Sequence, residues 1–138
     1  MNHALKNSIA YRFIRAANSV NKTLNNKLSP YDIAIEQRAT LEIIKFEEDV
    51  NQTMIANLLG KDKTTISRSL NSLEKKGLIS KSEISGDKRS NKVELTKEGE
   101  EILENTLDEV TSYRESLNEK LTKEEIESFF KILDKLEL

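Results

Sequence analysis

The sequence predicts a mainly α-helical fold with one small antiparallel β hairpin. Along most of the chain, apolar residues recur every three or four positions, as they do in helices with one buried face. The chain has a single proline, and 33% of its residues are charged, which favours helices with solvated outer faces. Between Leu78 and Leu95, two short apolar runs flank a basic turn, and this arrangement predicts the hairpin.

The N-terminal part of the chain is expected to hold two helices. The apolar spacing predicts one amphipathic helix from about His3 to Lys27. Ser29-Pro30-Tyr31-Asp32 interrupts the helical pattern, and a second helix is expected from about Ala34 to Phe46. Val50 is expected to form a one-residue bridge to the hairpin.

Residues 51–77 predict two short helices joined by a tight turn. Asn51 is expected to cap the first helix and Gly60 to end it. Asp62 is expected to cap the second helix, and Gly77 follows its last turn. The apolar residues that should be buried are Ile55, Leu58 and Leu59 in the first helix and Ile66, Leu70 and Leu73 in the second.

The segment 84–92, flanked by Leu78-Ile79 and Val93-Leu95, is expected to be a β-hairpin wing. Gly86 would supply the backbone conformation that the turn needs. Two helices followed by such a hairpin form the pattern of a winged helix-turn-helix, which lays its second helix in the DNA major groove.

Two further helices are expected after the hairpin. Thr96 should cap the first, and Thr122 with Glu125 forms a capping box for the second. With the N-terminal helix, their stripes offer more apolar surface than the winged module can cover, which predicts an intertwined helical dimer interface. The stripe residues are Leu103, Leu107, Val110, Leu117 and Leu121, then Ile126, Phe129, Phe130, Leu133 and Leu136.

The candidate DNA-reading surface is the face of the second short helix opposite its apolar stripe. Hydroxyl, amide and cationic side chains match base edges and phosphates, although a solvated helix face is the alternative. We expect base edges to be approached by Thr64, Thr65, Ser67 and Arg68, phosphates to be held by Lys61 and Lys63, and Asn71 to share this surface.

The charge distribution is uneven. Residues 49–97 hold ten Lys and Arg against six Asp and Glu, whereas residues 98–138 hold five against thirteen. A basic middle beside an acidic C-terminal part fits a DNA-binding module on a helical scaffold. A random scatter of surface charges is the alternative explanation for this distribution. The basic residues support DNA binding only because they lie in the same segment as the helix-turn-helix pattern.

Four segments carry a resemblance to a known family. They are Leu73-Glu74 with Gly77-Leu78-Ile79, the wing motif Asp87-Lys88-Arg89, Val93–Gly99 after it, and Glu36-Gln37 with Leu41 upstream. In these segments, and in the long helices before and after them, the chain resembles the MarR (multiple antibiotic resistance regulator) transcription factors. The resemblance implies a homodimer bound to a pseudo-palindromic operator in double-stranded DNA, usually as a repressor released by a small molecule or an oxidant.

The resemblance also implies domains and site residues. Residues 1–33 and 98–138 would form the dimerisation helices, and residues 34–97 the DNA-binding domain. In the wing, Arg89 would enter the minor groove and Asp87 would orient it through an ion pair. The remaining wing contacts would come from Lys88, Ser90 and Lys92.

The family further implies a pocket for a small aromatic or anionic effector. An arginine near aromatic rings suits a carboxylate ligand, and ordinary interface or surface roles are the alternative for each residue. The candidates are Tyr11, Arg12, Arg15, Tyr31 and Arg38.

Several functional classes find no support in the sequence. The chain lacks cysteine, which excludes thiolate zinc sites, disulfides and cysteine-based peroxide sensing. Its one histidine, His3, has no partners at metal-ligand spacing, and no nucleophile elbow or glycine-rich phosphate loop occurs, so we expect no metal, cofactor or enzymatic activity. No apolar run approaches ~18 residues and no leader is evident, so a cytoplasmic protein without membrane contact is expected. The alternative function is a winged-helix protein-interaction module without specific DNA binding.

Overall fold

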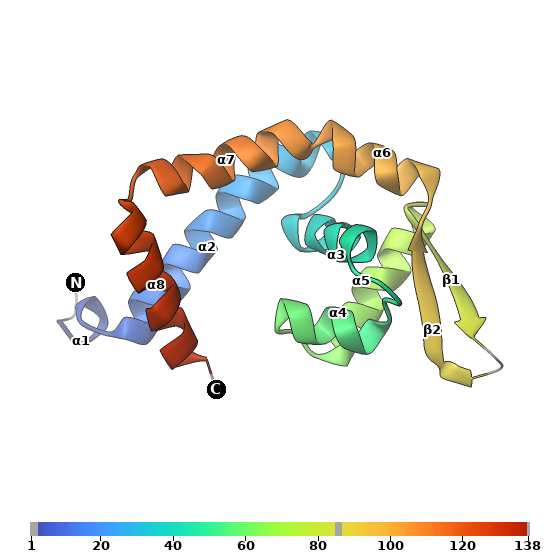
Figure 1. Cartoon of the computed structure of the whole chain (residues 1–138), viewed down its shortest axis with the longest axis horizontal. Coiled ribbons are helices and arrows are strands. Elements are labelled where there is room, and N and C mark those ends of the chain that lie inside the picture. The colour runs from blue at the N-terminus through green and yellow to red at the C-terminus, as the bar shows by residue number, and fades with distance from the viewer. Residues whose placement is uncertain (1–2, 85–86, 138) are drawn as a thin grey trace. The chain divides into compact units, whose positions relative to one another are not determined.

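The chain divides into two compact units, Met1–Thr106 and Leu107–Leu138. The computed structural model describes the backbone of residues 3–84 and 87–137 and the side chains of residues 4–82 and 92–137. The described elements are mostly helices, with one two-stranded antiparallel sheet (Figure 1), so the expected fold class is confirmed.

The N-terminal segment forms two helices where the sequence predicted one. α1 (His3–Lys6) and α2 (Ile9–Leu28) are separated at Ser8, whose backbone is extended. The Ser8 hydroxyl accepts a hydrogen bond of 3.1 Å from the Tyr11 amide and so caps α2. A serine that can satisfy a free amide in this way competes with helix continuation, which explains the break.

The second predicted helix is confirmed as α3 (Ile35–Phe46), which follows the short 3₁₀ helix η1 (Ser29–Tyr31). Gln37 caps its start, because its Oε1 accepts from the Ala34 amide at 3.2 Å. α3 is central to the first unit, since it contacts α2, α4, α6 and β2.

The two short helices are confirmed as α4 (Gln52–Leu59) and α5 (Lys63–Lys75), with the predicted caps. Asn51 Oδ1 accepts from the Met54 amide at 2.9 Å. Gly60 and Gly77 have φ of 64° and 75°, the left-handed conformation that glycine adopts without strain.

The predicted burial holds for α5 and only in part for α4, where Leu59 is half-buried. Ile66, Leu70 and Leu73 are all buried, as is Ile55 in α4, but Leu58 is 54% exposed. The prediction for Leu58 was wrong because α4 packs on its neighbours through Ile55 and the adjoining Ala56. Ala56 was too small to stand out in the apolar pattern.

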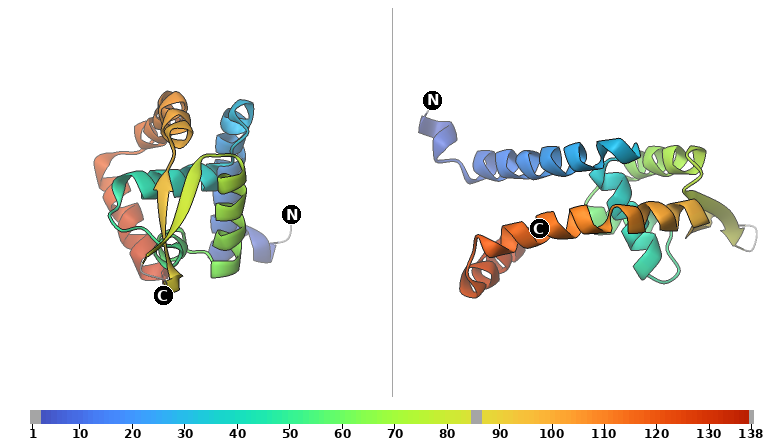
Figure 2. Two further views of the ribbon diagram at one scale, coloured as in Figure 1. Left: turned by 90° about the vertical axis from the view of Figure 1, so that its right-hand side faces the viewer. Right: turned by 90° about the horizontal axis from the view of Figure 1, so that it is seen from above.

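The hairpin consists of β1 (Ile79–Ile84) and β2 (Asp87–Leu95), paired antiparallel with Ile79 opposite Leu95. It extends away from the helices at one end of the first unit (Figure 2). The Val50 carbonyl accepts from the Val93 amide at 3.3 Å, which is the contact expected of a one-residue bridge, although Val50 itself lies outside the assigned strands. Gly86 lies outside the described residues.

The long helix predicted after the hairpin is interrupted at Thr106. α6 (Lys97–Asn105) ends the first unit, and Thr96 caps it by accepting from the Gly99 amide at 3.1 Å. α7 (Leu107–Glu119) begins the second unit. Leu107 of the predicted apolar stripe is exposed within the chain, and the neighbouring Thr106 is buried.

The second unit contains α7 and α8 (Lys123–Leu136), and the predicted capping box at α8 is confirmed. The Thr122 amide donates to Glu125 Oε1 at 2.9 Å, and the Glu125 amide donates to the Thr122 hydroxyl at 3.1 Å. The predicted apolar stripe of α8 remains largely exposed within the chain, most strongly at Phe129, Phe130 and Leu136, and Ile132, outside the predicted stripe, is exposed as well.

Candidate nucleic-acid interface

The outward face of α5 gathers the polar residues expected to read DNA. Thr64, Arg68 and Asn71 are exposed and follow one another at spacings of four and three, so they share one side of the helix. The buried stripe lies on the opposite side. Because this stripe packs into the core, the helix presents its polar face away from the body of the first unit.

The start of α5 is fixed by two contacts. Asp62 Oδ1 accepts from the Thr65 amide at 2.7 Å, and the Gln52 amide group of α4 donates to the Lys63 carbonyl at 3.0 Å. Hydrogen bonds from the Thr65 amide and then from its hydroxyl lower the pKa of Asp62 below its ordinary 3.8. Thr65 therefore serves the helix cap, which leaves its side chain less available to DNA than that of Thr64.

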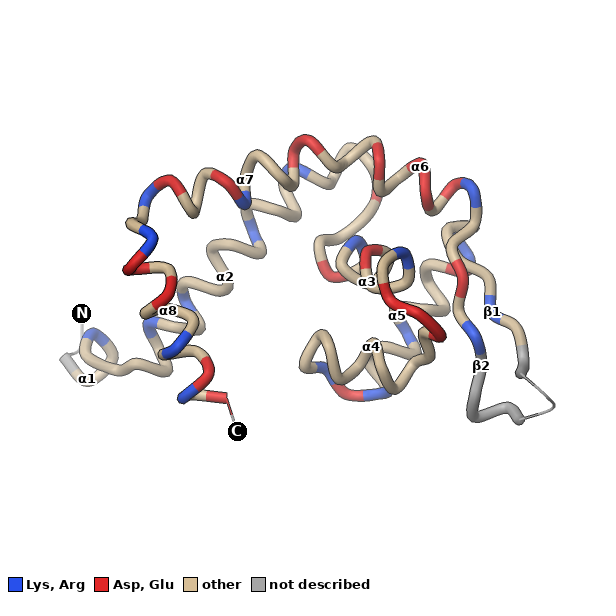
Figure 3. Tube along the Cα trace, in the orientation of Figure 1, with Lys and Arg blue, Asp and Glu red and all other residues tan. Residues whose placement is uncertain are grey.

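The cations at this surface differ in their partners. Among the described side chains, neither Lys63 nor Arg68 lies within ion-pair distance of a carboxylate. Lys61 Nζ lies 3.5 Å from Glu36 Oε2 in an exposed pair, which a phosphate could replace at little cost. In Figure 3, Lys or Arg positions (blue) flank an acidic position (red) near the turn between α4 and α5.

The wing contributes one described cation from the predicted set. Lys92 Nζ lies 3.1 Å from Glu94 Oε1 on the same strand. Asp87, Lys88, Arg89 and Ser90 belong to β2, but their side chains lie outside the described residues. The proposed Asp87–Arg89 ion pair therefore stays a prediction.

One residue of the interface was missed by the sequence reasoning. Lys81 of β1 donates to Asn71 Oδ1, and its Nζ lies 3.9 Å from Glu74 Oε1. The sequence shows only that Lys81 is a lysine in the first strand after the second short helix. Its significance appears only when the strand packs along α5.

The five residues expected to bind an effector occupy different environments. Arg12 and Arg15 are exposed on α2, while Tyr11 and Tyr31 are partly buried. Arg38 is 1% exposed. None of the five lines the cavity described below, and the structure does not bring them together around it.

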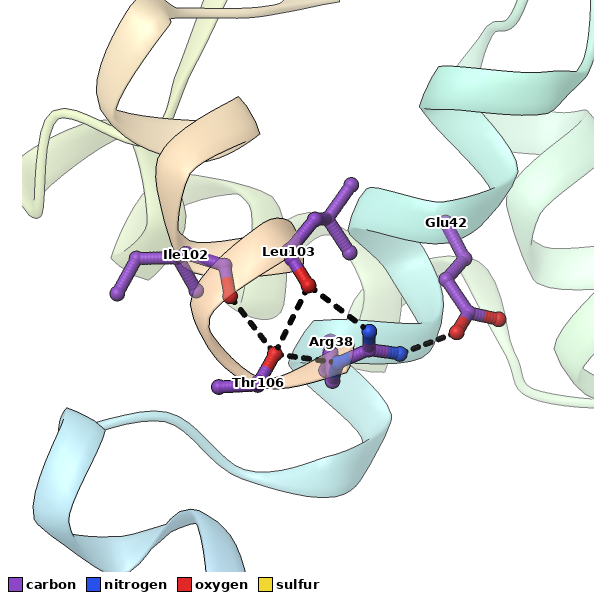
Figure 4. A network of polar contacts seen from close by, with 5 residues as sticks. All are labelled: Arg38, Glu42, Ile102, Leu103 and Thr106. Atoms are coloured by element: carbon purple, nitrogen blue, oxygen red, sulfur yellow. Dashed lines mark hydrogen bonds and ion pairs between the residues drawn. The ribbon is translucent and has the colours of Figure 1, made fainter. Parts of the chain in front are cut away.

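Arg38 is engaged in a buried polar network between α3 and the end of α6 (Figure 4). Its Nε donates to the Thr106 hydroxyl at 2.6 Å, and its Nη2 donates to the Leu103 carbonyl at 3.1 Å. Its Nη1 pairs with Glu42 on the next turn of α3. The Thr106 hydroxyl in turn donates to the Ile102 carbonyl at 2.7 Å. Arg38 thus binds the Leu103 carbonyl in the last turn of α6, so its guanidinium is already committed within the first unit.

A cavity lined by both polar and apolar residues lies beside the reading surface within the first unit. It has a volume of about 700 Å³, and Arg68 and Lys61 form part of its lining. Ser69 also lines it, and the Ser69 hydroxyl has no hydrogen-bond partner among the described residues. The other polar lining residues are Asn21, Asn25, Glu36 and Gln37.

Two further observations concern other kinds of site. In the described ranges 3–84 and 87–137, no helix is both long and apolar enough to cross a bilayer. No group of three or more His, Cys, Asp or Glu residues in this part of the chain is placed to hold a metal ion.

Comparisons with known proteins agree with this geometry. Residues 33–91 match the sequence profile of the MarR family. The chain is 27% identical to MepR of S. aureus in its complex with DNA, covering 94% of this chain and 96% of MepR, with a TM-score of 0.86. It is 25% identical to a MarR/EmrR family transcriptional regulator from Acinetobacter sp. ADP1, covering 92% of this chain and 90% of that one, with a TM-score of 0.84. CouR from Rhodococcus jostii RHA1, in complex with p-coumaroyl-CoA, shares the fold at 21% identity, 98% and 95% coverage, and a TM-score of 0.82.

Proposed function

We propose that the chain is a DNA-binding transcription regulator of the MarR family, and that it acts as a homodimeric repressor on a pseudo-palindromic operator. The observation that carries the proposal is the outward face of α5. There, Thr64, Arg68 and Asn71 are exposed together on a helix whose opposite face is buried and whose start is capped. The MepR structure, which contains DNA, gives a precedent for such a helix in a related chain.

In this proposal, base edges are read by α5 and phosphates are held around it. Arg68 is the best candidate for a bidentate contact with guanine, because it is exposed and has no described carboxylate partner. Lys63 and Lys61 hold phosphates, with Lys61 exchanging its exposed Glu36 pair. Base reading also includes Thr64, Thr65, Ser67 and Asn71, and the wing adds Lys88, Arg89, Ser90 and Lys92, with Asp87 orienting Arg89.

The homodimer is supported by apolar side chains that each unit leaves exposed. On α2 these include Ile9, Phe13 and Ile14, and α8 carries a further set. Patches of this kind usually mark subunit interfaces. Sedimentation at micromolar concentration should give about twice the chain mass of 15.8 kDa. A folded monomer at that concentration would contradict the dimer.

Selection of bound sequences from random duplex DNA tests the function. A twofold dimer presents two copies of α5, so the selected DNA should be an inverted repeat with half-site centres about 10 bp apart. Enrichment of unpaired half-sites alone would contradict the dimeric operator. A failure to enrich any sequence would instead favour a protein-interaction module.

For the effector we propose a small anionic or aromatic molecule, and we place it in the cavity beside α5. The supporting observation is that Arg68 and Lys61 line this cavity. An anion bound there would compete with DNA for the same cations. Salicylate or a similar aromatic acid should therefore release the selected operator from the wild-type protein. A release that survives in Arg68→Ala would place the effector elsewhere, with Tyr11, Arg12, Arg15 and Tyr31 as the next candidates.

A further inference from the structure

The hairpin contacts the outer edge of α5 through Lys81. Its ammonium group donates to Asn71 Oδ1 and lies 3.9 Å from the carboxylate of Glu74, one turn further along the helix. The Lys81 side chain is only 22% exposed, because β1 packs along α5. Lys81 is thus held between two residues of the helix proposed to read DNA.

The Lys81 contact determines which way the Asn71 amide faces. An ammonium group donates hydrogen bonds and cannot accept them, so the Asn71 atom that meets it must be the carbonyl oxygen. The Asn71 amide nitrogen keeps its two protons for another acceptor. Asn71 therefore offers DNA its two donors, while one of the two lone pairs of its acceptor oxygen is already engaged.

This orientation bears on the base that Asn71 can recognise. An asparagine reads adenine through both of its polar atoms, since it accepts from N6 and donates to N7. Guanine presents only acceptors, N7 and O6, on the same edge. The Lys81 ammonium group takes one lone pair of Oδ1 and places a positive charge beside it, which disfavours a second donor such as adenine N6. The two free donors of Asn71 therefore match guanine better than adenine.

We propose that Lys81 is a specificity-determining positioning residue, which holds Asn71 as a hydrogen-bond donor so that the operator carries guanine where Asn71 meets the major groove. The proposal rests on the proposed function, in which α5 reads DNA. Glu74 supports this role, because its carboxylate balances the ammonium charge at the helix edge. Lys81 acts through Asn71 and does not itself need to touch a base.

The test measures affinity for the selected operator and for duplexes with each base pair changed in turn. Asn71→Ala first identifies the base pair whose preference depends on Asn71. At that pair, the wild-type protein should prefer guanine to adenine about tenfold, which corresponds to one good base contact. Lys81→Met, which keeps the chain length and removes the donor, should reduce this ratio about tenfold. Lys81→Arg, which again only donates, should restore it.

Lys92→Met is the matched control. Lys92 lies on the neighbouring strand, one position from the residue that pairs with Lys81. Its described ion-pair partner is Glu94. Removing its charge should weaken binding to every duplex and leave the guanine-to-adenine ratio unchanged. Nuclear magnetic resonance of the free proteins adds a readout without DNA: the Asn71 side-chain amide signals should shift in Lys81→Met and stay in place in Lys92→Met.

Three results would overturn the inference. In the first, Lys81→Met lowers the affinity for every duplex but leaves the preference at the base pair read by Asn71 within about twofold of wild type. Lys81 would then be a phosphate contact. Another is a wild-type preference for adenine at that pair. The third is an Asn71→Ala protein with unchanged preference at every position. If the wild-type protein selects no sequence at all, the proposed function fails first, and the inference fails with it.

Discussion

Replacing Thr106 with valine should destabilise the protein by about 2 kcal/mol. Valine has nearly the shape of threonine, so the change opens no cavity and removes only the hydroxyl. That hydroxyl accepts from Arg38 Nε at 2.6 Å in a site where both residues are buried. A hydrogen bond to a charged group contributes about 1.5–3 kcal/mol, and the cost of an unpaired buried donor is of similar size. The Ile102 carbonyl keeps its bond from the Thr106 amide at 3.1 Å, so it adds little to the loss.

Thr40→Val is the matched control. Thr40 is as buried as Thr106, but its hydroxyl donates to the Glu36 carbonyl one turn earlier at 3.0 Å. That carbonyl also accepts the normal helical bond, so the loss should stay below about 1 kcal/mol. Urea unfolding followed by circular dichroism, at equal protomer concentration, measures both values. Equal losses in the two variants would refute the role assigned to the Arg38–Thr106 bond.

The remaining predictions concern a close approach, a helix end, a cap and a phosphate contact. Gly99→Ala should cost at least about 2 kcal/mol in urea unfolding, because its Cβ would lie 2.1 Å from the Leu78 carbonyl oxygen. Gly77→Ala should cost only about 1 kcal/mol, since it meets no atom within 4 Å and strains the backbone alone, so equal losses would contradict this account. Because the pKa of Asp62 is lowered in the folded state, its stabilising effect should be complete above pH 3.8 and lost as the pH falls through the folded-state pKa. Asp62→Asn should abolish that acid-side loss, as measured by thermal melts across the range. Lys63→Ala should lower the salt slope of DNA binding by about 0.9, and an unchanged slope would exclude a phosphate contact.

The features that the sequence predicted well depend on local chemistry. Asn51, Gly60, Asp62 and Gly77 mark the ends of α4 and α5 as expected, because a cap needs only a suitable side chain or a permissive backbone within one turn. At Gly77, the Gly77 and Leu78 amides donate to the Glu74 and Leu73 carbonyls at 2.9 and 3.0 Å, which closes the helix without a distant partner. The hairpin was also predictable from nearby residues, because two short apolar runs flank a basic turn that contains Gly86.

The features that were missed depend on neighbours distant in the sequence. Arg38 was considered for an effector site, yet its main partners lie 65 and 68 residues away in the chain. Apolar spacing predicted one continuous helix through this region, whereas the helix is interrupted at Thr106, whose buried hydroxyl accepts a hydrogen bond from Arg38. Periodicity predicts that a helix has a buried face, but packing partners decide where that face begins and ends.

The candidate site also has a part that nearby residues predict and a part that depends on residues distant in the sequence. The polar face of α5 could be predicted, because its residues belong to one helix with a clear apolar side. The contact of Lys81 with Asn71 could not, since it joins a strand to a helix through the way the hairpin packs. The exposed apolar stripe of α8 was expected to form a dimer surface, and this role stays a prediction.

The central claim is that the outward face of α5 reads base sequence, and one measurement tests it most directly. Fluorescence anisotropy at fixed salt would compare affinity for the selected operator with affinity for a scrambled duplex of equal composition. The wild-type protein should prefer the operator by about a thousandfold or more. A variant with Thr64, Arg68 and Asn71 all changed to alanine should bind both duplexes within about threefold of each other, because mainly phosphate contacts remain. If that variant folds with an unchanged melting temperature and keeps the wild-type preference, sequence is read elsewhere and the account is wrong.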